Sequence, residues 1–535
     1  MKKGKLKKYT NKGITLIALV ITIIVLLILA GVSIAMLTGE NGVLTKATEA
    51  KDQTEIAQEK EEISMAYAAS KANKVDQVAD PVTATELQGE LDKLNSLGTA
   101  DDSYGLKVTY PNGHIYTIDQ LTGIISGPDI KEENTATAPE YWEKTTTVDS
   151  EWYSYADVSN GNQKINANAP RLNGAMTPIK YIGPDKDEQT GSKWANAITQ
   201  DGSMWVWIPR FAYRITSGYH DSEEGTIEVI FIDTNNKPLN GESATIVTDP
   251  SQLTYIGESQ NEYLVHPAFT DEVNNGGGFG NKSGFWIGKF ETTGTKETPT
   301  VKAGENMLVN MTINEQYRVA KSATFGETQN LNSHMAKNSE WGATVYLAHS
   351  KYGTNGQKVE NQGGEYIAGG SSTASTIYTT NKKTTTTHNA YGVYGMNGGA
   401  WEYVASYVDY EDSMSADSKT NGGYGEDDSI LGKDSTEREI STAYKTVYPA
   451  EGIDKEASYN NLAKNIKGDA IYETSNSASN ASTSWFDAFA SFPGTSNPFF
   501  DRSGLSDARN AGTFYFSYSN GSTYSGCSSR VVLVP

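Results

Sequence analysis

The chain has 535 residues, a formal net charge of −21 and one cysteine, Cys527. Its length suggests two to four domains, and its acidity argues against nucleic acid as a partner, because phosphate contacts need lysine and arginine. A single cysteine excludes an intrachain disulfide, so the fold must be stabilised by its core or by bound ions.

The first predicted element is an apolar helix that follows a basic segment. Residues 1–13 carry six lysines and no acid, and residues 14–37 form an apolar run of 24 residues without a charge. With a rise of about 1.5 Å per residue, this run is long enough to cross a hydrocarbon core of about 30 Å. The pattern predicts a single-pass membrane protein with a cytoplasmic N-terminus, and the bulk of the chain outside the cell.

The junction of these two segments, Lys12-Gly13-Ile14, resembles the leader of type IV prepilins and of the pseudopilins of type II secretion. The resemblance implies that a prepilin peptidase cuts between Gly13 and Ile14 and that the new N-terminus is methylated. It also implies other pilin subunits as partners and a place at the cell surface or in a pilus. At Ala18 the family usually has a glutamate that pairs with a neighbouring subunit, so filament and monomer both stay open.

Two helices are predicted after the apolar run. Gly39 and Gly42 follow the run and should break or hinge the helix just outside the bilayer. From Val43 to about Lys74, alanine and isoleucine recur at three- and four-residue spacings among Glu, Lys and Gln, which predicts a helix. Residues 85–97 form a second, shorter amphipathic pattern.

A small sheet is predicted to follow. Residues 106–110 and 114–118 alternate in polarity on either side of a Pro-Asn-Gly turn, which is typical of a hairpin. We interpret residues 38–127 as a pilin-like stalk and small head, and the polar, proline-bounded residues 128–140 as a linker.

The rest of the chain, residues 141–535, has no long helical period. Short aromatic runs alternate with Gly, Asn and Ser. The clearest helix is predicted at residues 339–350, where Ser339 can cap the N-terminus and Trp341 lies on the apolar face with Val345 and Ala348.

Five segments of this region resemble the formylglycine-generating-enzyme (sulfatase-modifying-factor) branch of the C-type lectin fold. In chain order they are GFWIGKFETT at 284–293, NSEWGA at 338–343, GMNGGAWEYV at 395–404, RSG at 502–504 and SRVVL at 529–533. The resemblance implies a loop-rich α+β domain over residues 141–535, with its core at about 205–535. The predicted fold class is therefore α+β: a long transmembrane or pilin helix with a small antiparallel sheet, a linker and a large lectin-like domain.

The resemblance does not extend to catalysis. The family binds copper through two cysteines after its RGG turn, whereas residues 502–510 here contain none. We interpret Cys527 as a small buried residue, since no histidine lies near it in sequence. The six histidines lack zinc-site spacing. The sequence thus predicts no enzyme and no cofactor, with a divergent formylglycine-generating oxidase as the alternative.

Two acidic stretches are candidates for a structural Ca²⁺, which prefers several oxygen ligands. They are Asp409, Glu411 and Asp412, and residues 426–428 (Glu-Asp-Asp). Neither matches an EF-hand, and solvated acidic loops are the alternative, so the sequence assigns no metal ligand.

The last fifty residues predict a binding surface. Residues 485–529 are rich in Phe, Tyr, Ser, Asn, Asp, Gly and Ala, the mixture of rigid aromatic and small polar side chains found in antibody paratopes. Alternation places Phe514 and Phe516 in the core. The predicted ligand-binding residues are Trp485, Tyr515, Ser517, Ser519, Asn520, Tyr524 and Ser528. Trp401 and Trp341 are interpreted as core residues.

This C-terminal composition also resembles the variable proteins of diversity-generating retroelements, which use lectin-like domains of this type. The predicted function is a membrane-anchored, pilin-like surface protein that displays a non-catalytic binding domain for an extracellular protein or glycan. The alternatives are a minor pseudopilin at the tip of a secretion or pilus filament, and the divergent oxidase.

Overall fold

The computed structural model describes residues 43–74, 80–101, 106–111, 114–130, 134–145, 154–157, 163–184, 191–239, 241, 243–250, 261–270, 279–328, 330–363, 366–461, 463–505 and 511–534. The chain divides into two compact units, Met1–Lys131 and Glu132–Pro535. Residues 134–140 of the predicted linker belong to the second unit, where Asn134 is buried and its side-chain amide donates to the Ile198 carbonyl (3.2 Å).

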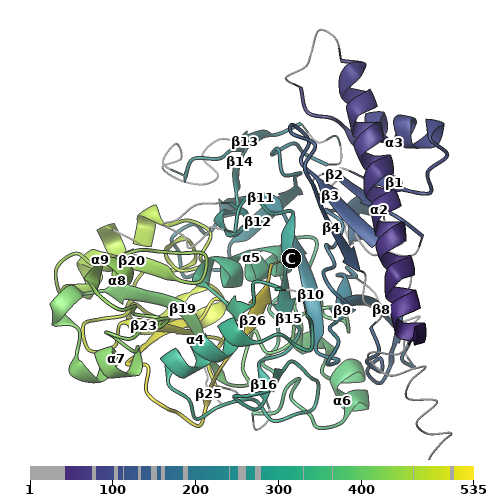
Figure 1. The fold of residues 1–535 in the computed structure, drawn as a ribbon. Coiled ribbons are helices and arrows are strands. Elements are labelled where there is room, and N and C mark those ends of the chain that lie inside the picture. Colours follow the sequence, from purple (N-terminus) through teal and green to yellow (C-terminus); the bar gives the residue numbers. More distant parts are fainter. Residues whose placement is uncertain are drawn as a thin grey trace, which may run out of the picture. The chain divides into compact units, whose positions relative to one another are not determined.

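The first unit contains helices α2 (Val43–Ala72) and α3 (Ala84–Lys93) and a four-stranded antiparallel sheet (Figure 1). The strands are β1 (Thr99–Asp101), β2 (Leu106–Thr109), β3 (His114–Ile118) and β4 (Ile125–Ile130), in that order. Ile63, Ala66 and Tyr67 of α2 belong to the same core as Leu106 and Tyr116 of the sheet. The predicted helix and hairpin are therefore both present.

The structure corrects the predicted membrane helix in the fold class and the predicted single-pass location. Within the described ranges, no helix is long and apolar enough to cross a membrane. The helix α2 mixes alanine with Glu, Lys and Gln throughout its length. The fold is a mixed α/β arrangement with many strands. The run at 14–37, and the predicted cleavage position between Gly13 and Ile14, lie outside the described residues.

The second unit is built around two large sheets. The first has the order β18-β26-β15-β10-β9-β8-β5. Its strands are β18 (His334–Met335), β26 (Val531–Leu533), β15 (Gly284–Gly288), β10 (Met204–Pro209), β9 (Asn196–Ile198), β8 (Thr177–Tyr181) and β5 (Trp142–Lys144). All of β10 and β15 is buried, because packing covers both faces of the sheet there. Trp207 lies opposite Trp286 in register, with ring centroids 5.2 Å apart.

The second sheet positions the candidate site. Its order is β20-β19-β23-β24-β22-β21, and β25 pairs with β19 outside this path. Figure 1 labels β19, β20, β23 and β25. The strands are β20 (Thr446–Pro449), β19 (Trp401–Asp409), β23 (Phe499–Arg502), β24 (Phe516–Ser519), β22 (Ala488–Ser491), β21 (Ser479–Ser484) and β25 (Cys527–Ser529). Strand β19 runs antiparallel to β23 and parallel to β25, so segments about a hundred residues apart in the chain become neighbours.

The remaining described strands of this unit form a four-stranded sheet, β12-β11-β14-β13, and two two-stranded sheets, β16-β17 and β6-β7. The other strands are β11 (Phe211–Ser217), β12 (Thr226–Phe231), β13 (Thr245–Val247), β14 (Glu262–Val265), β16 (Thr293–Gly294), β17 (Pro299–Thr300), β6 (Ser154–Asp157) and β7 (Gln163–Asn166). The α-helices are α4 (Ile313–Ser322), α5 (Asn338–His349), α6 (Ala374–Thr379), α7 (Ala416–Asn421), α8 (Ser435–Arg438) and α9 (Lys455–Asn461).

The helix α5 differs from its prediction at both its cap and its faces. Ser339 is not the N-cap; it lies inside the helix, and the Glu340 carboxylate instead accepts from the backbone N–H of Lys337, the N-cap residue (3.0 Å). Every residue of α5 is buried, so the helix has no solvated face. Trp341 is a core residue, as predicted.

Candidate functional site

A buried ion pair lies on one face of the second large sheet. The Arg530 guanidinium donates to both Glu402 oxygens (2.7 and 3.1 Å) and to the carbonyls of Gly288 and Tyr394 (2.9 Å each). Both charged side chains are 0 % exposed. Arg530 therefore joins three of the five segments that carried the lectin-fold resemblance.

A second buried arginine joins the other two segments. Arg502 donates to the Asn338 side-chain oxygen (3.2 Å) and to the carbonyls of Asp469 and Ala470 (3.1 Å each). The Ser503 hydroxyl donates to the Gly395 and Gly398 carbonyls (3.0 and 2.9 Å). These residues use their hydrogen bonds to hold the core together, which makes their role structural.

The opposite face of the same sheet forms the floor of a cavity. In the strand register, Tyr403 lies opposite Asp501, Asp501 opposite Ser517, and Trp401 opposite Cys527, so these side chains share one face. The cavity has a volume of about 340 Å³. It is lined by five aromatic residues, three serines, one aspartate and one cysteine: Trp401, Tyr403, Tyr515, Tyr518, Tyr524, Ser517, Ser519, Ser522, Asp501 and Cys527. Tyr518 lies opposite Phe500 in the register, out of phase with Ser517, so its ring lies on the other face of the sheet.

Asp501 is the charged group of this cavity. Its side chain is 7 % exposed, and its Oδ1 has no hydrogen-bond partner among the described residues. Burial raises the pKa of Asp501 to about 7, against smaller opposing effects of the Tyr515 hydroxyl and of Arg502. A buried carboxylate with an unused oxygen is costly unless something pairs with it.

The other polar groups of the floor are neutral. Tyr403 donates to the Ser522 carbonyl (2.9 Å), and its hydroxyl lies 3.0 Å from the Ser519 Oγ. Burial raises the pKa values of Tyr403 and Tyr515 above their ordinary range. Burial also raises the pKa of Cys527 well above its ordinary value, so this cysteine is a thiol and a poor nucleophile at neutral pH.

Four of the predicted ligand-binding residues line the cavity: Tyr515, Ser517, Ser519 and Tyr524. Tyr524 is 45 % exposed and its ring lies 5.3 Å from that of Trp401, centroid to centroid. Tyr524 therefore forms the open rim of the cavity, whereas the other three belong to its floor.

The structure places the other three predicted residues elsewhere. Trp485 is fully buried in the core, where its indole N–H donates to the Gly218 carbonyl (2.9 Å). Ser528 is fully buried on the opposite face of the sheet, in register with Glu402, because its position is one residue out of phase with Cys527. Asn520 does not line the cavity; its side-chain oxygen accepts from the Ser522 backbone N–H (3.1 Å).

Sequence reasoning missed several lining residues. Trp401 was predicted as core but is half-buried at the cavity, and Tyr403, Asp501, Tyr518 and Ser522 were not singled out. The available signal was the alternation of Trp401, Glu402 and Tyr403, which predicts that the two aromatic residues share a face. Which face of the sheet Trp401 and Tyr403 occupy depends on how β19 pairs with β23.

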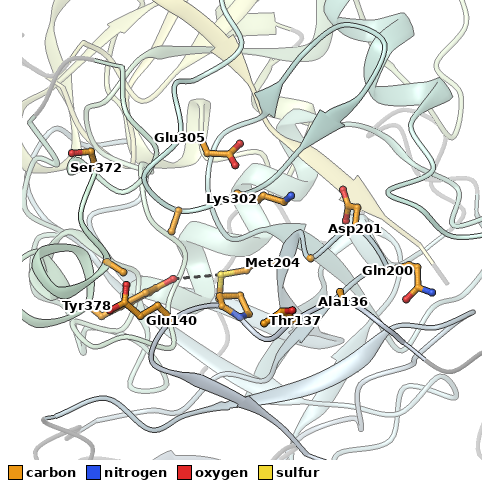
Figure 2. Close-up of a pocket in the computed structure, with 14 residues that line it drawn as sticks. Ala136, Thr137, Glu140, Gln200, Asp201, Met204, Lys302, Glu305, Ser372 and Tyr378 are labelled. Atoms are coloured by element: carbon orange, nitrogen blue, oxygen red, sulfur yellow. Dashed lines mark hydrogen bonds between the residues drawn. The ribbon is translucent and has the colours of Figure 1, made fainter.

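A larger cavity, of about 510 Å³, lies elsewhere in the second unit. Figure 2 shows its labelled side chains spread along the walls, with the Tyr378 hydroxyl directed at the Met204 sulfur (3.4 Å). One acid of its lining, the partly buried Asp201, accepts hydrogen bonds at both oxygens from Thr199 and Ser203 (2.8–2.9 Å). No described side chain of this lining has a buried polar atom without a partner, so the cavity offers less to a ligand than its size suggests.

The acidic stretches considered for Ca²⁺ are paired with basic side chains. Asp409 accepts from Arg438 (2.8 Å), and the second stretch pairs with Arg318, Lys321 and Lys433. In the described ranges, no group of three or more His, Cys, Asp or Glu is arranged to hold a metal ion.

Comparison of the chain with protein-family models and with curated proteins gives no match. The resemblances to prepilins, formylglycine-generating enzymes and retroelement variable proteins thus remain sequence-based predictions.

Proposed function

We propose that the second unit is a non-catalytic ligand-binding domain and that the cavity above β19, β23, β24 and β25 is its binding site. The observation that carries the proposal is the joint presence of four aromatic side chains and an unpaired buried carboxylate oxygen at one cavity. Pockets that bind small ligands are usually apolar or aromatic with a few placed polar groups.

The chemistry of the lining favours binding over catalysis. The described lining contains no histidine or lysine, and its cysteine is protonated at neutral pH. Tyrosine and serine side chains combine rigid contact area with adaptable hydrogen bonds, which is the composition of recognition surfaces. The volume of about 340 Å³ suits a small molecule or one protruding group of a larger protein or glycan.

The test is a ligand screen against the full chain, by saturation-transfer NMR with a fragment library and by glycan array. Tyr524→Ala should weaken hits by about tenfold, since it removes the aromatic contact at the rim of the cavity and tenfold corresponds to about 1.4 kcal/mol of binding free energy. Tyr424→Ala is the matched control, because Tyr424 is also an exposed tyrosine (39 % against 45 %) and does not line the cavity. If no hit responds to Tyr524→Ala, the cavity is not the binding site.

A further inference from the structure

We infer that the cavity over β19, β23, β24 and β25 binds a protonated alkylamine, whose ammonium group donates to the Asp501 carboxylate and whose alkyl chain lies against Trp401 and Tyr524. This inference rests on the proposed function, because it names the ligand class for the same cavity.

Asp501 differs from the other buried acids of the second sheet in lacking a counter-charge. Glu402 has Arg530 at 2.7 Å, and Asp409 has Arg438 at 2.8 Å. Arg502 follows Asp501 in the chain, but strand alternation directs it to the opposite face, where carbonyls and Asn338 accept its N–H groups. No ion pair among the described residues includes Asp501.

Exposure to the cavity distinguishes Asp501 from the other incompletely satisfied acids. Glu291 and Asp409 also have buried oxygens without a hydrogen-bond partner, but Glu291 is 0 % exposed and lies 3.9 Å from Arg530, and Asp409 is paired with Arg438. Asp501 lines the cavity instead. An ionised carboxylate only accepts hydrogen bonds, so the group that completes Asp501 must be a donor, and a cation offsets its charge best.

The lining favours an ammonium group over a metal ion. Asp501 is the only carboxylate among the described residues of the lining, and its Oδ1 has no hydrogen-bond partner among them. Ca²⁺ takes six to eight oxygen ligands, usually including several carboxylates. A single carboxylate suits an N–H donor of one positive charge, which a primary or secondary ammonium supplies and a quaternary ammonium does not.

The aromatic walls suit the same ligand. A cation within about 6 Å of the face of a tryptophan or tyrosine ring is attracted by the ring quadrupole, most strongly by tryptophan. Trp401 and Tyr524 stand together at the rim, with ring centroids 5.3 Å apart, and can cover an alkyl chain. The net charge of −21 also favours the approach of cations.

The experiment measures binding of n-butylamine to the full chain by ligand-observed NMR and calorimetry at pH 8. The neutral analogue n-butanol and the quaternary analogue n-butyltrimethylammonium should each bind at least about tenfold more weakly. Asp501→Asn should remove n-butylamine binding, whereas Glu297→Gln, which removes one exposed charge outside the cavity lining, should leave it unchanged.

Two further ligands test whether the amine is a free small molecule or a lysine side chain of a peptide. Nα-acetyl-lysine methylamide represents a lysine side chain on a peptide, and its Nε-acetylated form is the neutral control. Tighter binding of the blocked lysine than of n-butylamine supports a peptide ligand, and the reverse order supports a free amine. Equal binding of the charged and Nε-acetylated forms overturns the inference.

The outcomes also separate this inference from the proposed function. If n-butylamine binds neither the wild-type chain nor any variant, or binds Asp501→Asn unchanged, the amine inference is overturned. If, in addition, screening hits are lost in Tyr524→Ala but kept in Asp501→Asn, the cavity is a binding site for neutral ligands and the proposed function stands. Circular dichroism of Asp501→Asn confirms that loss of binding does not come from unfolding.

Discussion

The sheet containing β19, β23 and β25 buries charged side chains on both faces, and the two faces differ in whether these side chains have partners inside the protein. On one face, Glu402 and Arg530 pair within 2.7 Å, and Arg502 donates to carbonyls and to Asn338. On the other face, Asp501 lies among aromatic and serine side chains with one oxygen unused. Both arrangements come from the same strands, because alternate residues point to opposite faces.

This contrast separates groups that hold the fold from groups that are available to a ligand. A buried charged side chain that is paired within the protein constrains the structure. A buried charged side chain without a partner lowers the stability of the protein, and it is retained where it has a function. The predictions below test whether the two faces differ in this way.

The largest loss of stability is expected on the face that carries Glu402 and Arg530. Arg530→Met would leave Glu402 buried without its counter-charge and four hydrogen bonds unmade, and should lower the free energy of unfolding by about 3–5 kcal/mol. Urea denaturation of the full chain measures it, and Glu402→Gln combined with Arg530→Met should recover part of the loss. A change below about 1 kcal/mol would show that the pair is not structural.

On the face that carries Asp501, removing the charged group should instead increase the free energy of unfolding. The pKa of Asp501 is raised to about 7 from its ordinary 3.8. Between about pH 4 and pH 7 the folded state therefore binds more protons than the unfolded state does, and the free energy of unfolding falls as the pH rises. Asp501→Asn removes that fall and should raise stability by about 1–3 kcal/mol at pH 8, and by little at pH 4.

The matched control for this prediction is Asp409→Asn. Asp409 is buried at the end of β19 but is paired with Arg438, so its neutralisation should lower the melting temperature at pH 8. Thermal unfolding of both variants at pH 4 and pH 8 provides the measurement. Destabilisation of similar size in both would remove the distinction between paired and unpaired acids.

Ligand affinity should also depend on pH. An alkylammonium keeps its charge between pH 6 and pH 8, whereas Asp501 changes from mostly protonated to mostly ionised, so n-butylamine should bind about tenfold more tightly at pH 8. Tyr403, Tyr515 and Cys527 face the carboxyl and stay neutral there, and Arg502, with a pKa lowered to about 10 by burial, stays charged. Calorimetry at the two pH values tests this, and a flat profile would contradict it.

The smallest effect concerns the tyrosine beneath the rim. Tyr403→Phe removes the hydroxyl that bonds to Ser522 and Ser519, and should cost about 1 kcal/mol of stability while loosening the segment that carries Tyr524. Tyr424→Phe serves as the control on an exposed tyrosine. Equal melting temperatures for the two variants would mean that these hydrogen bonds do not support the cavity.

Local pattern was enough to predict several elements and to assign some core residues. The helix from Val43, the hairpin at residues 106–118 and the helix at residues 338–349 follow from periodicity and turn residues, which depend on near neighbours alone. Alternation likewise predicted that Phe514 and Phe516 are buried. Each of these signals lies within one continuous segment of chain.

Tertiary structure alone decided the composition of the site. Alternation shows that Trp401 and Tyr403 share a face and that Asp501 and Arg502 do not, but it does not show which face is covered. Pairing of β19 with β23 and β25 brings Trp401, Asp501 and Tyr524 to one cavity, while the same pairing and the packing around it bury Ser528 and Trp485. Strand partners about a hundred residues away set this outcome, so the sequence by itself predicts an aromatic binding surface and only the fold selects the residues that form it.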